Sequence, residues 1–394
     1  MKIKHVLYVF LIAIFATGCT SKKLNEDSLP FIDVRKNYPE KEISLTDFAD
    51  VDYIHLSTVH DDFLYRGSIF NVTNNTIVVY DYSSFSILFF TRDGTPKSRF
   101  NRCGQGPEDY FGVSRIIYDE EQDDVFVGYE KGGDKYLKVY SSTGEYKRVI
   151  PLPQYTELNW LYTFDNQSLF GHTFNPSSQP ERSSYYTTYY RISKTNGEIL
   201  DSLNLPSNEV RLVAPLQNHI GGTMRVIYSR LVKGTDGFYL CNPETDTVFL
   251  YNNEKTLIPV FRKIPSVRNL DPMIVIDNMV DASRYQFFNL STLYGDRQGP
   301  NQKYPNRYYI RDKETGEIFR QKIILPDYKG KEFNINATVR RSYYGDGNGY
   351  LFELELMELK KAYDENRLGG KLKELVATLN ELEDNNVFML VHFR

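Results

Sequence analysis

An acidic run is the group of residues with the clearest potential for chemistry in this sequence. Its members are Asp119, Glu120, Glu121, Asp123 and Asp124. Clustered carboxylates suit calcium, but this run falls within a single predicted hairpin turn and lacks the fixed spacing of a calcium-binding loop. We therefore interpret it as a solvated turn, with a calcium site as the alternative.

The motifs of common catalytic sites are absent from the sequence. It contains no His-x-x-x-His pair, no Cys-x-x-Cys pair and no Gly-x-Ser-x-Gly elbow. A catalytic metal would need acids or histidines that converge from distant segments. The histidines beyond the first eighteen residues are scattered, and each is interpreted as structural: His55, His60, His172, His219 and His392. An enzyme is therefore the less favoured class, and no cofactor is expected.

Two long polar segments are better candidates for binding. Residues 175–190 and 294–309 interrupt predicted strands and combine Arg, Gln, Asn and Tyr. Aromatic faces stack on sugars and peptides, while amide and guanidinium groups form hydrogen bonds with them. The candidate ligand-binding residues are Arg182, Tyr185, Arg297, Gln298 and Tyr304, together with Trp160 near the start of the third repeat. For any one aromatic side chain, a buried place in the core is the alternative.

The first eighteen residues (1–18) have the form of a signal peptide. Two lysines precede an apolar run at 6–15, which is too short to span a bilayer. The sequence Ala-Thr-Gly-Cys at 16–19 resembles a bacterial lipobox, although Ala16 stands where Leu is commoner. We expect cleavage before Cys19 and attachment of diacylglycerol to its sulfur. An ordinary signal peptide is the alternative.

Composition limits the partners of the mature chain. The 394 residues carry a formal net charge of −4 and no basic stripe, so nucleic acid is not expected to bind. Residues 19–39 are polar and aperiodic, which predicts a flexible tether. The three cysteines do not suggest a disulfide framework, and Cys103 and Cys241 are expected to stay separate thiols.

A strand, a tight polar turn and a second strand recur along the chain. Five copies lie at 87–100, 136–150, 189–203, 248–261 and 308–324. Glycine takes the same turn position in four of them, where a positive φ keeps the hairpin tight: Gly94, Gly144, Gly197 and Gly316. In the fourth copy Lys255 takes this position, so we expect that turn to be built differently.

Further predicted strands precede the hairpins and make six units in all. The sixth unit ends at 387–393 without its turn and outer strand. The segment 42–57 can supply the missing strand, and closing a ring in this way removes exposed sheet edges. The sequence therefore predicts an all-β fold, a six-bladed β-propeller at 40–394 that is closed by an N-terminal strand. An open solenoid is the alternative.

A helical insertion is predicted in the last unit, at 357–383. Leucine recurs there at steps of three and four residues, which is the period of an amphipathic helix: Leu368, Leu372, Leu375, Leu379 and Leu382. Gly369 and Gly370 are expected to separate two helical pieces. The apolar stripe either docks a partner or, as we favour, packs against the sixth blade.

Three stretches resemble a family of six-bladed β-propeller lipoproteins from Gram-negative gut bacteria. They are GQGPEDY at 104–110, DTVFLYNNEKTLIPVF at 246–261 and EDNNVFMLVHF at 383–393. With the lipobox, the resemblance covers essentially the whole mature chain. The sequence departs from the family at Glu108-Asp109, where Gly-Glu is commoner, and at Asn386-Val387, where Asn-Pro is usual. The family is NHL-like, largely of unassigned function and often associated with nutrient acquisition, so the resemblance implies architecture and little chemistry.

The loop at 104–110 has two interpretations. Its two glycines permit unusual backbone angles, and Pro107 fixes its own φ. As a rim loop it would contact a ligand through Gln105, Glu108 and Tyr110. As the favoured alternative, it is a turn between the first two blades that the ring needs for closure.

Together these features predict a lipid-anchored binding or scaffolding module of the cell envelope. We expect an outer-membrane lipoprotein that faces the periplasm or the cell surface and binds a glycan, a peptide or a partner envelope protein. The alternative is a metal-dependent hydrolase or lyase with its site in the central channel, which convergent acids and histidines would support. A third interpretation is a structural partner in an envelope complex, docked through the helical insertion.

Overall fold

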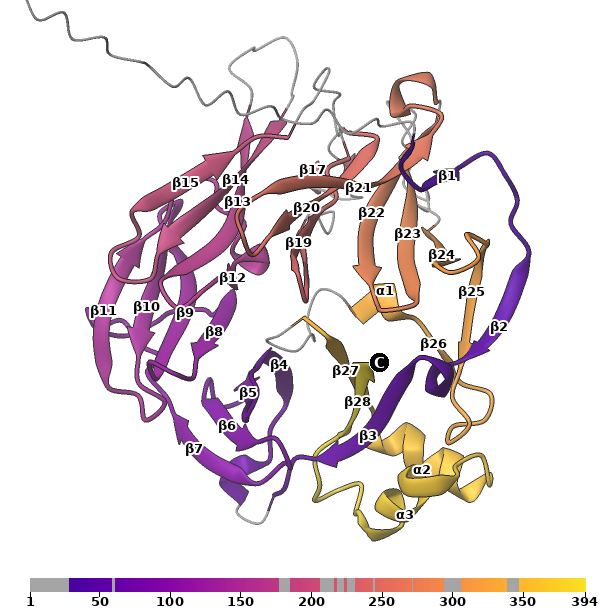
Figure 1. Cartoon of the computed structure of the whole chain (residues 1–394). Helices are drawn as coiled ribbons and strands as arrows, with labels where there is room; N and C mark the ends of the chain where they lie inside the picture. Colours follow the sequence, from indigo (N-terminus) through magenta and orange to yellow (C-terminus); the bar gives the residue numbers. More distant parts are fainter. Residues whose placement is uncertain are drawn as a thin grey trace, which may run out of the picture.

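The computed structural model of the chain shows a ring of six β-sheets (Figure 1). It describes residues 28–58, 61–176, 185–205, 216–217, 223–224, 231–243, 245–270, 272–293, 306–338 and 347–394. The sheets follow one another around a central axis as the blades of a propeller. The predicted six-bladed β-propeller is confirmed.

Blades 1 to 3 each have four antiparallel strands in chain order. Blade 1 consists of β4 (Gly67–Val72), β5 (Thr76–Asp81), β6 (Ile87–Thr91) and β7 (Pro96–Phe100). Blade 2 consists of β8 (Arg115–Asp119), β9 (Asp124–Lys131), β10 (Asp134–Tyr140) and β11 (Tyr146–Pro151). Blade 3 consists of β12 (Tyr162–Thr163), β13 (Ser168–Pro176), β14 (Tyr185–Ser193) and β15 (Ile199–Leu203).

Blades 4 to 6 take additional strands from other parts of the chain. Blade 4 consists of β18 (Leu231–Gly234), β19 (Gly237–Leu240), β20 (Thr247–Asn252), β21 (Leu257–Ile264) and β1 (Phe31–Asp33). Blade 5 consists of β22 (Met273–Asp281), β23 (Tyr285–Leu293), β24 (Asn306–Asp312), β25 (Ile318–Ile324), β2 (Glu40–Ser44) and β26 (Glu332–Phe333). Blade 6 consists of β27 (Gly349–Leu354), β28 (Val387–Phe393) and β3 (Ala49–His55). Outside the blades lie the helix α1 (Ile335–Thr338) and the short pair β16 (Leu216–Gln217) and β17 (Thr223–Met224).

The N-terminal segment is shared among three neighbouring blades. β1 pairs in parallel with β21, β2 pairs in parallel with β25, and β3 pairs antiparallel with β28. The predicted closure of the ring is confirmed for β3, which lies opposite the whole length of β28. Two details of the prediction are wrong. Residues 42–44 of the predicted closing segment join blade 5 as part of β2 instead of blade 6. Residues 31–33 belong to a blade, whereas their sequence predicts part of a tether.

The apolar core lies mainly between the blades. Neighbouring blades pack face to face, and separate clusters of buried side chains fill the interfaces of blades 6 and 1, 1 and 2, 2 and 3, and 3 and 4. Between blades 1 and 2, for example, the rings of Phe89 and Tyr118 meet edge to face with their centroids 5.2 Å apart. Because both faces of a blade are covered, β5 is buried along its whole length. This explains why many strands appear in the sequence as continuous apolar runs.

The hairpin turns before the outer strands of blades 1 to 5 share one design. In each, a side-chain oxygen of the first turn residue accepts a hydrogen bond from a backbone N–H further along. These first residues are Thr91, Ser141, Ser193, Asn252 and Asp312. A residue with positive φ then completes the turn: Gly94, Gly144, Gly197, Lys255 or Gly316. The expectation of a different fourth turn is wrong, because Lys255 has a φ of 64° and adopts the left-handed backbone of the glycines.

Gly144 is required by space as well as by backbone conformation. Its φ is 86°, and a Cβ at this position would lie 2.6 Å from the Cβ of Phe100 on blade 1. Gly316 has a φ of 75°, but a Cβ at this position would have no neighbouring atom within 4 Å. We therefore expect Gly316→Ala to lower the free energy of unfolding by about 1 kcal/mol through backbone strain alone. Gly144→Ala should lower it by roughly 2–4 kcal/mol, because blades 1 and 2 must also move apart.

Urea unfolding of the wild type and the two glycine variants measures this difference. Both substitutions add one methyl group at a positive φ, so they differ only in what surrounds the new atom. Equal losses of stability in the two variants would show that the contact with blade 1 has no energetic role.

Two helices form the insertion in blade 6. They are α2 (Leu356–Asp364) and α3 (Gly370–Thr378), and α3 lies beside β3 (Figure 1). The predicted break at Gly369 is confirmed. Leu372 and Val376 are fully buried in a cluster with blades 5 and 6, whereas Leu382 is 83% exposed. Except at Leu382, the apolar stripe is used within the protein, in agreement with the favoured interpretation.

Candidate functional site

A pocket opens where inner strands of four blades come together. It is lined by β4, β8, β12 and β18, by the turns that follow the first three of these strands and by the turn that follows β14. Its volume is about 240 Å³, which corresponds to about eight water molecules at ~30 Å³ each. Eleven of its fifteen lining residues are polar or charged, so the pocket suits a small polar ligand.

Arg115, the first residue of β8, forms part of the pocket lining. It lies opposite Gly128 on β9, where a Cβ would come within 3.3 Å of the Cβ of Arg115, so the glycine leaves room for the arginine. The Arg115 Nε donates a hydrogen bond of 3.2 Å to the Leu161 carbonyl oxygen. Its guanidinium carbon lies 4.8 Å from the centroid of the Tyr162 ring. Burial lowers the pKa of this guanidinium.

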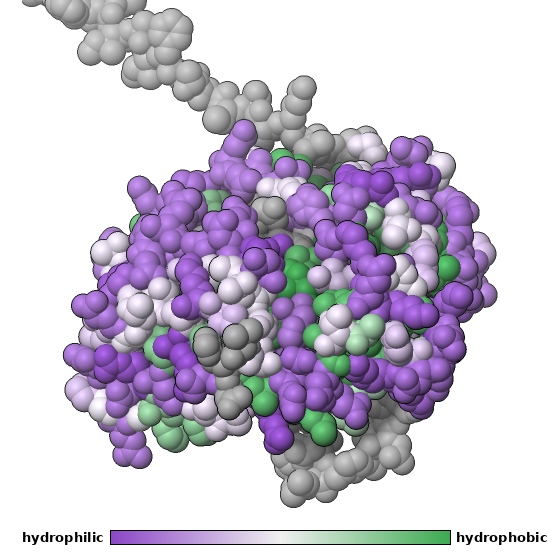
Figure 2. All heavy atoms as spheres, turned by 90° about the horizontal axis from the view of Figure 1, so that it is seen from below, coloured by the Kyte–Doolittle hydropathy of each residue, from purple (hydrophilic) through white to green (hydrophobic). Residues whose placement is uncertain are grey.

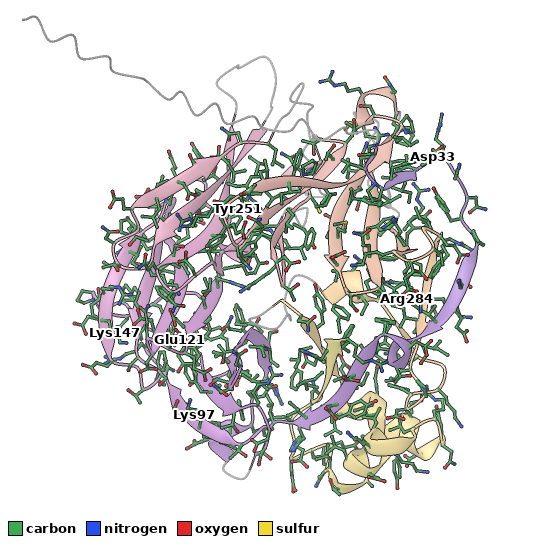
Figure 3. All side chains as sticks on the ribbon, in the orientation of Figure 1. Asp33, Lys97, Glu121, Lys147, Tyr251 and Arg284 are labelled. Atoms are coloured by element: carbon green, nitrogen blue, oxygen red, sulfur yellow. The ribbon has the colours of Figure 1, made fainter. Side chains whose placement is uncertain are left out.

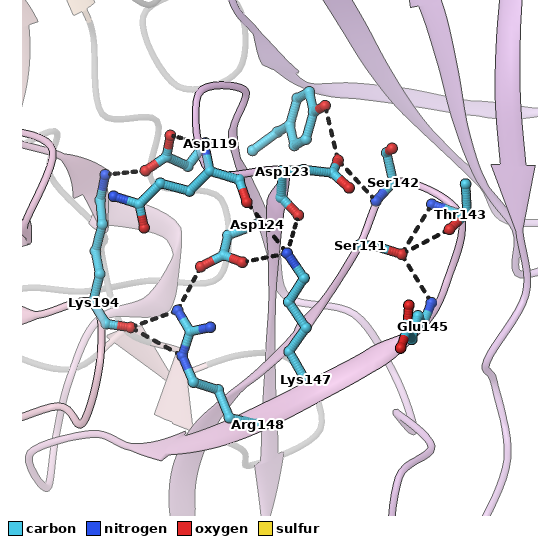
Figure 4. A network of polar contacts seen from close by, with 12 residues as sticks. Asp119, Asp123, Asp124, Ser141, Ser142, Thr143, Glu145, Lys147, Arg148 and Lys194 are labelled. Carbon is cyan, nitrogen blue, oxygen red and sulfur yellow. Dashed lines mark hydrogen bonds and ion pairs between the residues drawn. The ribbon is translucent and has the colours of Figure 1, made fainter.

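Two aspartates of the acidic run are buried and have ionic partners (Figure 4). The Asp119 carboxylate lies 2.5 Å from the Nζ of Lys194 on blade 3, and both side chains are almost fully buried. Asp124 is paired with Lys147 at 2.8 Å and with Arg148 at 2.5 Å. Burial acts to raise the pKa of Asp124, but the hydrogen bonds from Arg148 and Lys147 outweigh it and the pKa is lowered. The interpretation as a solvated turn is therefore wrong for Asp119 and Asp124.

Glu120 connects blade 2 to blade 1 at the edge of the pocket. Its carboxylate accepts hydrogen bonds from the Oγ1 atoms of Thr73 and Thr76, at 3.0 and 2.5 Å, and from the Nδ2 of Asn75 at 3.1 Å. Burial acts to raise the pKa of Glu120, but these donors outweigh it and the pKa is lowered. The neighbouring Glu121, labelled in Figure 3, is exposed to solvent.

Lys233 of β18 adds a further cation to the pocket. Its Nζ donates a hydrogen bond of 3.4 Å to the carbonyl oxygen of Thr163, and it lies 6.0 Å from the centroid of the Phe238 ring. With Arg115 and Lys194, three cationic side chains line the pocket, and three carboxylates of the acidic run line it as well. The formal charge of the lining is therefore balanced.

The described residues contain neither a cluster of metal ligands nor a disulfide bond. No three His, Cys, Asp or Glu side chains come close enough there to hold a metal ion. Calcium binding stays an untested prediction. Cys103 and Cys241 are both free thiols, as expected.

The loop at 104–110 is held tightly between blades 1 and 2. Tyr110 is fully buried and its hydroxyl donates a hydrogen bond of 2.8 Å to the Phe85 carbonyl oxygen, so its predicted role in ligand binding is wrong. From β10, Lys138 donates to the Pro107 carbonyl oxygen at 2.9 Å and Tyr140 donates to the Glu108 carbonyl oxygen at 2.6 Å. These contacts favour the interpretation as a turn between blades.

The two glycines of this loop serve a different purpose from the one expected. Neither Gly104 nor Gly106 has a positive φ. A Cβ at either position would instead approach the Asp109 carboxylate, to 2.4 Å at Gly104 and 2.7 Å at Gly106. The backbone N–H of Gly106 donates to that carboxylate at 2.9 Å. The glycines therefore make space for Asp109, while the side chains of Gln105 and Glu108 remain exposed.

None of the predicted binding residues that the structure describes lines the pocket. Trp160 is fully buried in the cluster between blades 3 and 4, so the core alternative holds for it. Tyr185 is the first residue of β14, and its side chain is not among the described ones. Several predictions fall outside the described residues altogether: Cys19, Arg182, Arg297, Gln298 and Tyr304.

The pocket residues that sequence reasoning missed are Arg115, Lys194 and Lys233. Each lies at one end of a largely apolar stretch, in SRIIYD, YYRISK and RLVKG, and the last two stretches each contain a second cation, Arg191 or Arg230. A cation in such a place is unusual, because strands buried on both faces seldom contain charge. This was the available signal, but only the structure shows that three different blades bring these cations together.

Fold and site define the chain as a six-bladed β-propeller with a polar pocket beside its axis. Residues 29–392 match the family described as Domain of unknown function (DUF4934), and the chain belongs to that family.

Comparison with solved structures finds similar chains in Bacteroides. One is a candidate exported protein from Bacteroides fragilis NCTC 9343, with 14% sequence identity and a TM-score of 0.57, over 93% of this chain and 99% of that chain. Another is a member of the DUF4221 family from Bacteroides vulgatus ATCC 8482, with 12% identity and a TM-score of 0.43, over 88% of this chain and 97% of that chain. At such identity the first likeness supports the fold alone. A comparison with curated proteins finds no match.

Proposed function

We propose that this protein is a lipid-anchored binding propeller of the cell envelope, which takes a small polar ligand such as part of a glycan in the pocket beside its axis. The observation that carries this proposal is the lining of the pocket. Four blades contribute to it through inner strands of the ring and the turns beside them, so its polar groups come from several elements and not from one loop.

The state of the lining carboxylates favours binding over proton transfer. A general base or acid works best with a pKa near the working pH, and in enzymes burial raises the pKa of such carboxyl groups. In this pocket the pKa of Glu120 is lowered by three hydrogen-bond donors, and Asp119 is held by Lys194. Carboxylates held in place in this way orient hydroxyl groups of a ligand well.

Envelope location is supported by the N-terminal sequence. The signal sequence with Cys19 provides a lipid anchor, and an outer-membrane lipoprotein is the location that we propose. In the described residues, no helix has both the length and the apolar character that a membrane crossing requires. The face seen in Figure 2 is mainly hydrophilic with scattered hydrophobic areas, so it offers no broad membrane-binding surface. A similar propeller from Bacteroides fragilis is described as a candidate exported protein.

A pocket-blocking variant tests the proposed function. Asn166 is exposed and lines the pocket, whereas the adjacent Gln167 is exposed and does not. The full-length protein, purified from the membrane fraction, is screened by thermal shift against neutral and charged monosaccharides, short oligosaccharides and dipeptides. We expect at least one saccharide to raise the melting temperature of the wild type and of Gln167→Trp but not of Asn166→Trp.

Two results would contradict the proposal. One is a screen in which no compound stabilises the wild type, and the other is equal stabilisation of the two tryptophan variants. The anchor is tested in the same preparation, because Cys19→Ser should remove the protein from the membrane fraction. An unchanged membrane fraction for Cys19→Ser would contradict lipid anchoring while leaving the pocket result to stand.

A further inference from the structure

Arg115 is a buried cation for which the described protein supplies no counter-ion. It is only 6% exposed, and its one hydrogen bond to the described residues runs from Nε to the Leu161 carbonyl oxygen. The Tyr162 ring covers one face of the guanidinium. Burying a charge without a partner is costly, so such a residue is retained where something else requires it.

Other arginines of the ring show what a structural role looks like in this protein. Arg191 is 8% exposed and is paired with Asp165 at 3.3 Å and Asp201 at 2.7 Å. Arg148 is paired with Asp124 at 2.5 Å. Arg115 is more deeply buried than Arg191, yet among the described residues it contacts no carboxylate.

The contacts of Arg115 leave its terminal nitrogens for a ligand. Its Nε donates a hydrogen bond to the Leu161 carbonyl oxygen, and the Tyr162 ring covers one face of the guanidinium. The side chain forms part of the pocket wall. The two Nη groups of a guanidinium form a planar fork that matches the two oxygens of a carboxylate. A guanidinium that is already packed and oriented loses little further freedom when such a group binds.

The rest of the lining suits the other groups of a ligand. Three carboxylates and three cations line the pocket, so its formal charge is balanced and one singly charged ligand can be accommodated beside Arg115. The exposed Glu121 and the amide groups of Asn74 and Asn166 suit the hydroxyl groups of a ligand, which both donate and accept hydrogen bonds. The volume of about 240 Å³ can hold a small molecule or one sugar unit.

From this arrangement we infer that Arg115 is the recognition residue for a carboxylate, and that the pocket takes a small hydroxylated carboxylic acid of the sugar-acid class. This inference rests on the proposed binding function and specifies its ligand. The carboxylate of the ligand accepts hydrogen bonds from the two Nη groups of Arg115. The hydroxyl groups of the ligand contact the side chains of Glu121, Asn74 and Asn166.

A stability measurement on the free protein tests the role of Arg115 without any ligand. If Arg115 is held for a ligand, Arg115→Met replaces an unpaired buried charge by an apolar side chain of similar length. The melting temperature of the full-length variant should then stay unchanged or rise by a few degrees. A clear fall in the melting temperature would show that Arg115 stabilises the folded protein, and would overturn the inference.

A panel of matched ligands then tests the ligand class by calorimetry. D-glucuronate, D-galacturonate and D-gluconate are each compared with their neutral counterparts, D-glucose, D-galactose and D-glucitol, and D-glucose 6-phosphate is added as the phosphate. We expect at least one acid to bind more tightly than its counterpart, and Arg115→Met to weaken that binding by about 10- to 100-fold. Arg115→Lys should lose part of the affinity, since a point charge cannot form the planar fork.

The outcomes separate this inference from the proposed function. Neutral sugars that bind as well as the acids, with unchanged affinity in Arg115→Met, would overturn the carboxylate assignment and leave the binding function intact. Tighter binding of glucose 6-phosphate than of every acid would also overturn it. Failure of every compound in the panel and in the wider screen would count against both proposals.

Discussion

Deletion of residues 1–56 is expected to abolish folding of the propeller. The deletion removes β1, β2 and β3 and leaves the edge of β28 without its partner strand. The buried apolar side chains that it removes include Leu45, Phe48, Ile54 and Leu56. At about 1.5–3 kcal/mol for each buried side chain, their loss is roughly 6–12 kcal/mol, which is comparable to the whole stability of a typical domain.

The matched control is a chain that lacks only residues 1–27, which precede the described propeller. This chain should unfold in urea at the midpoint of the full-length protein. The longer deletion should give aggregated protein with no cooperative transition, because an open sheet edge invites intermolecular pairing. A soluble, cooperatively folding product of the longer deletion would show that the ring does not depend on β3 for its closure.

Lys194→Met is expected to be strongly destabilising for a single substitution. It leaves the Asp119 carboxylate buried without its counter-ion, at a position where the lysine and aspartate side chains are only 3% and 8% exposed. Removing one member of a buried ion pair typically costs about 3–5 kcal/mol, because the remaining charge stays desolvated. The free energy of unfolding in urea should fall by this amount.

Two further variants assign the cause of this loss. The double variant Lys194→Met, Asp119→Asn removes both charges and should recover most of the lost stability. Lys371→Met breaks the ion pair with Asp52, whose side chains are 73% and 65% exposed, and should leave the urea midpoint unchanged. If the double variant proved as unstable as the single one, the loss would come from packing of the lysine stem and not from the unpaired acid.

The architecture was largely predictable because local signals repeat along the chain. Each of five hairpins combines apolar strands with a polar first turn residue and a residue of positive φ, and the missing strand of the sixth unit matched a spare strand near the N-terminus. Lys255 shows the limit of this reasoning: the fold imposes the left-handed backbone on a residue that does not prefer it.

The candidate site was much less predictable than the fold. Tyr110 and Trp160 are residue types that often contact ligands, but both are buried in the core. A large aromatic side chain fills an interface between blades as well as it contacts a ligand. Arg115, Lys194 and Lys233 are separated by tens of residues, and only the curvature of the ring brings them to one pocket. The local sequence around Asp119 and Asp124 predicts solvation, and this prediction fails because the cationic partners of the two aspartates lie on other strands or another blade.

The shared N-terminal segment also determines how the molecule responds to mechanical force. A pull on the N-terminus reaches β1 first, then β2, and only afterwards β3, which are strands of three, five and seven residues on three successive blades. The two short parallel strands lie at the outer edges of complete sheets, so they can detach while β3 still closes the ring. Under a pull on the N-terminus we therefore expect these two strands to detach first, while the pocket beside the axis keeps its shape.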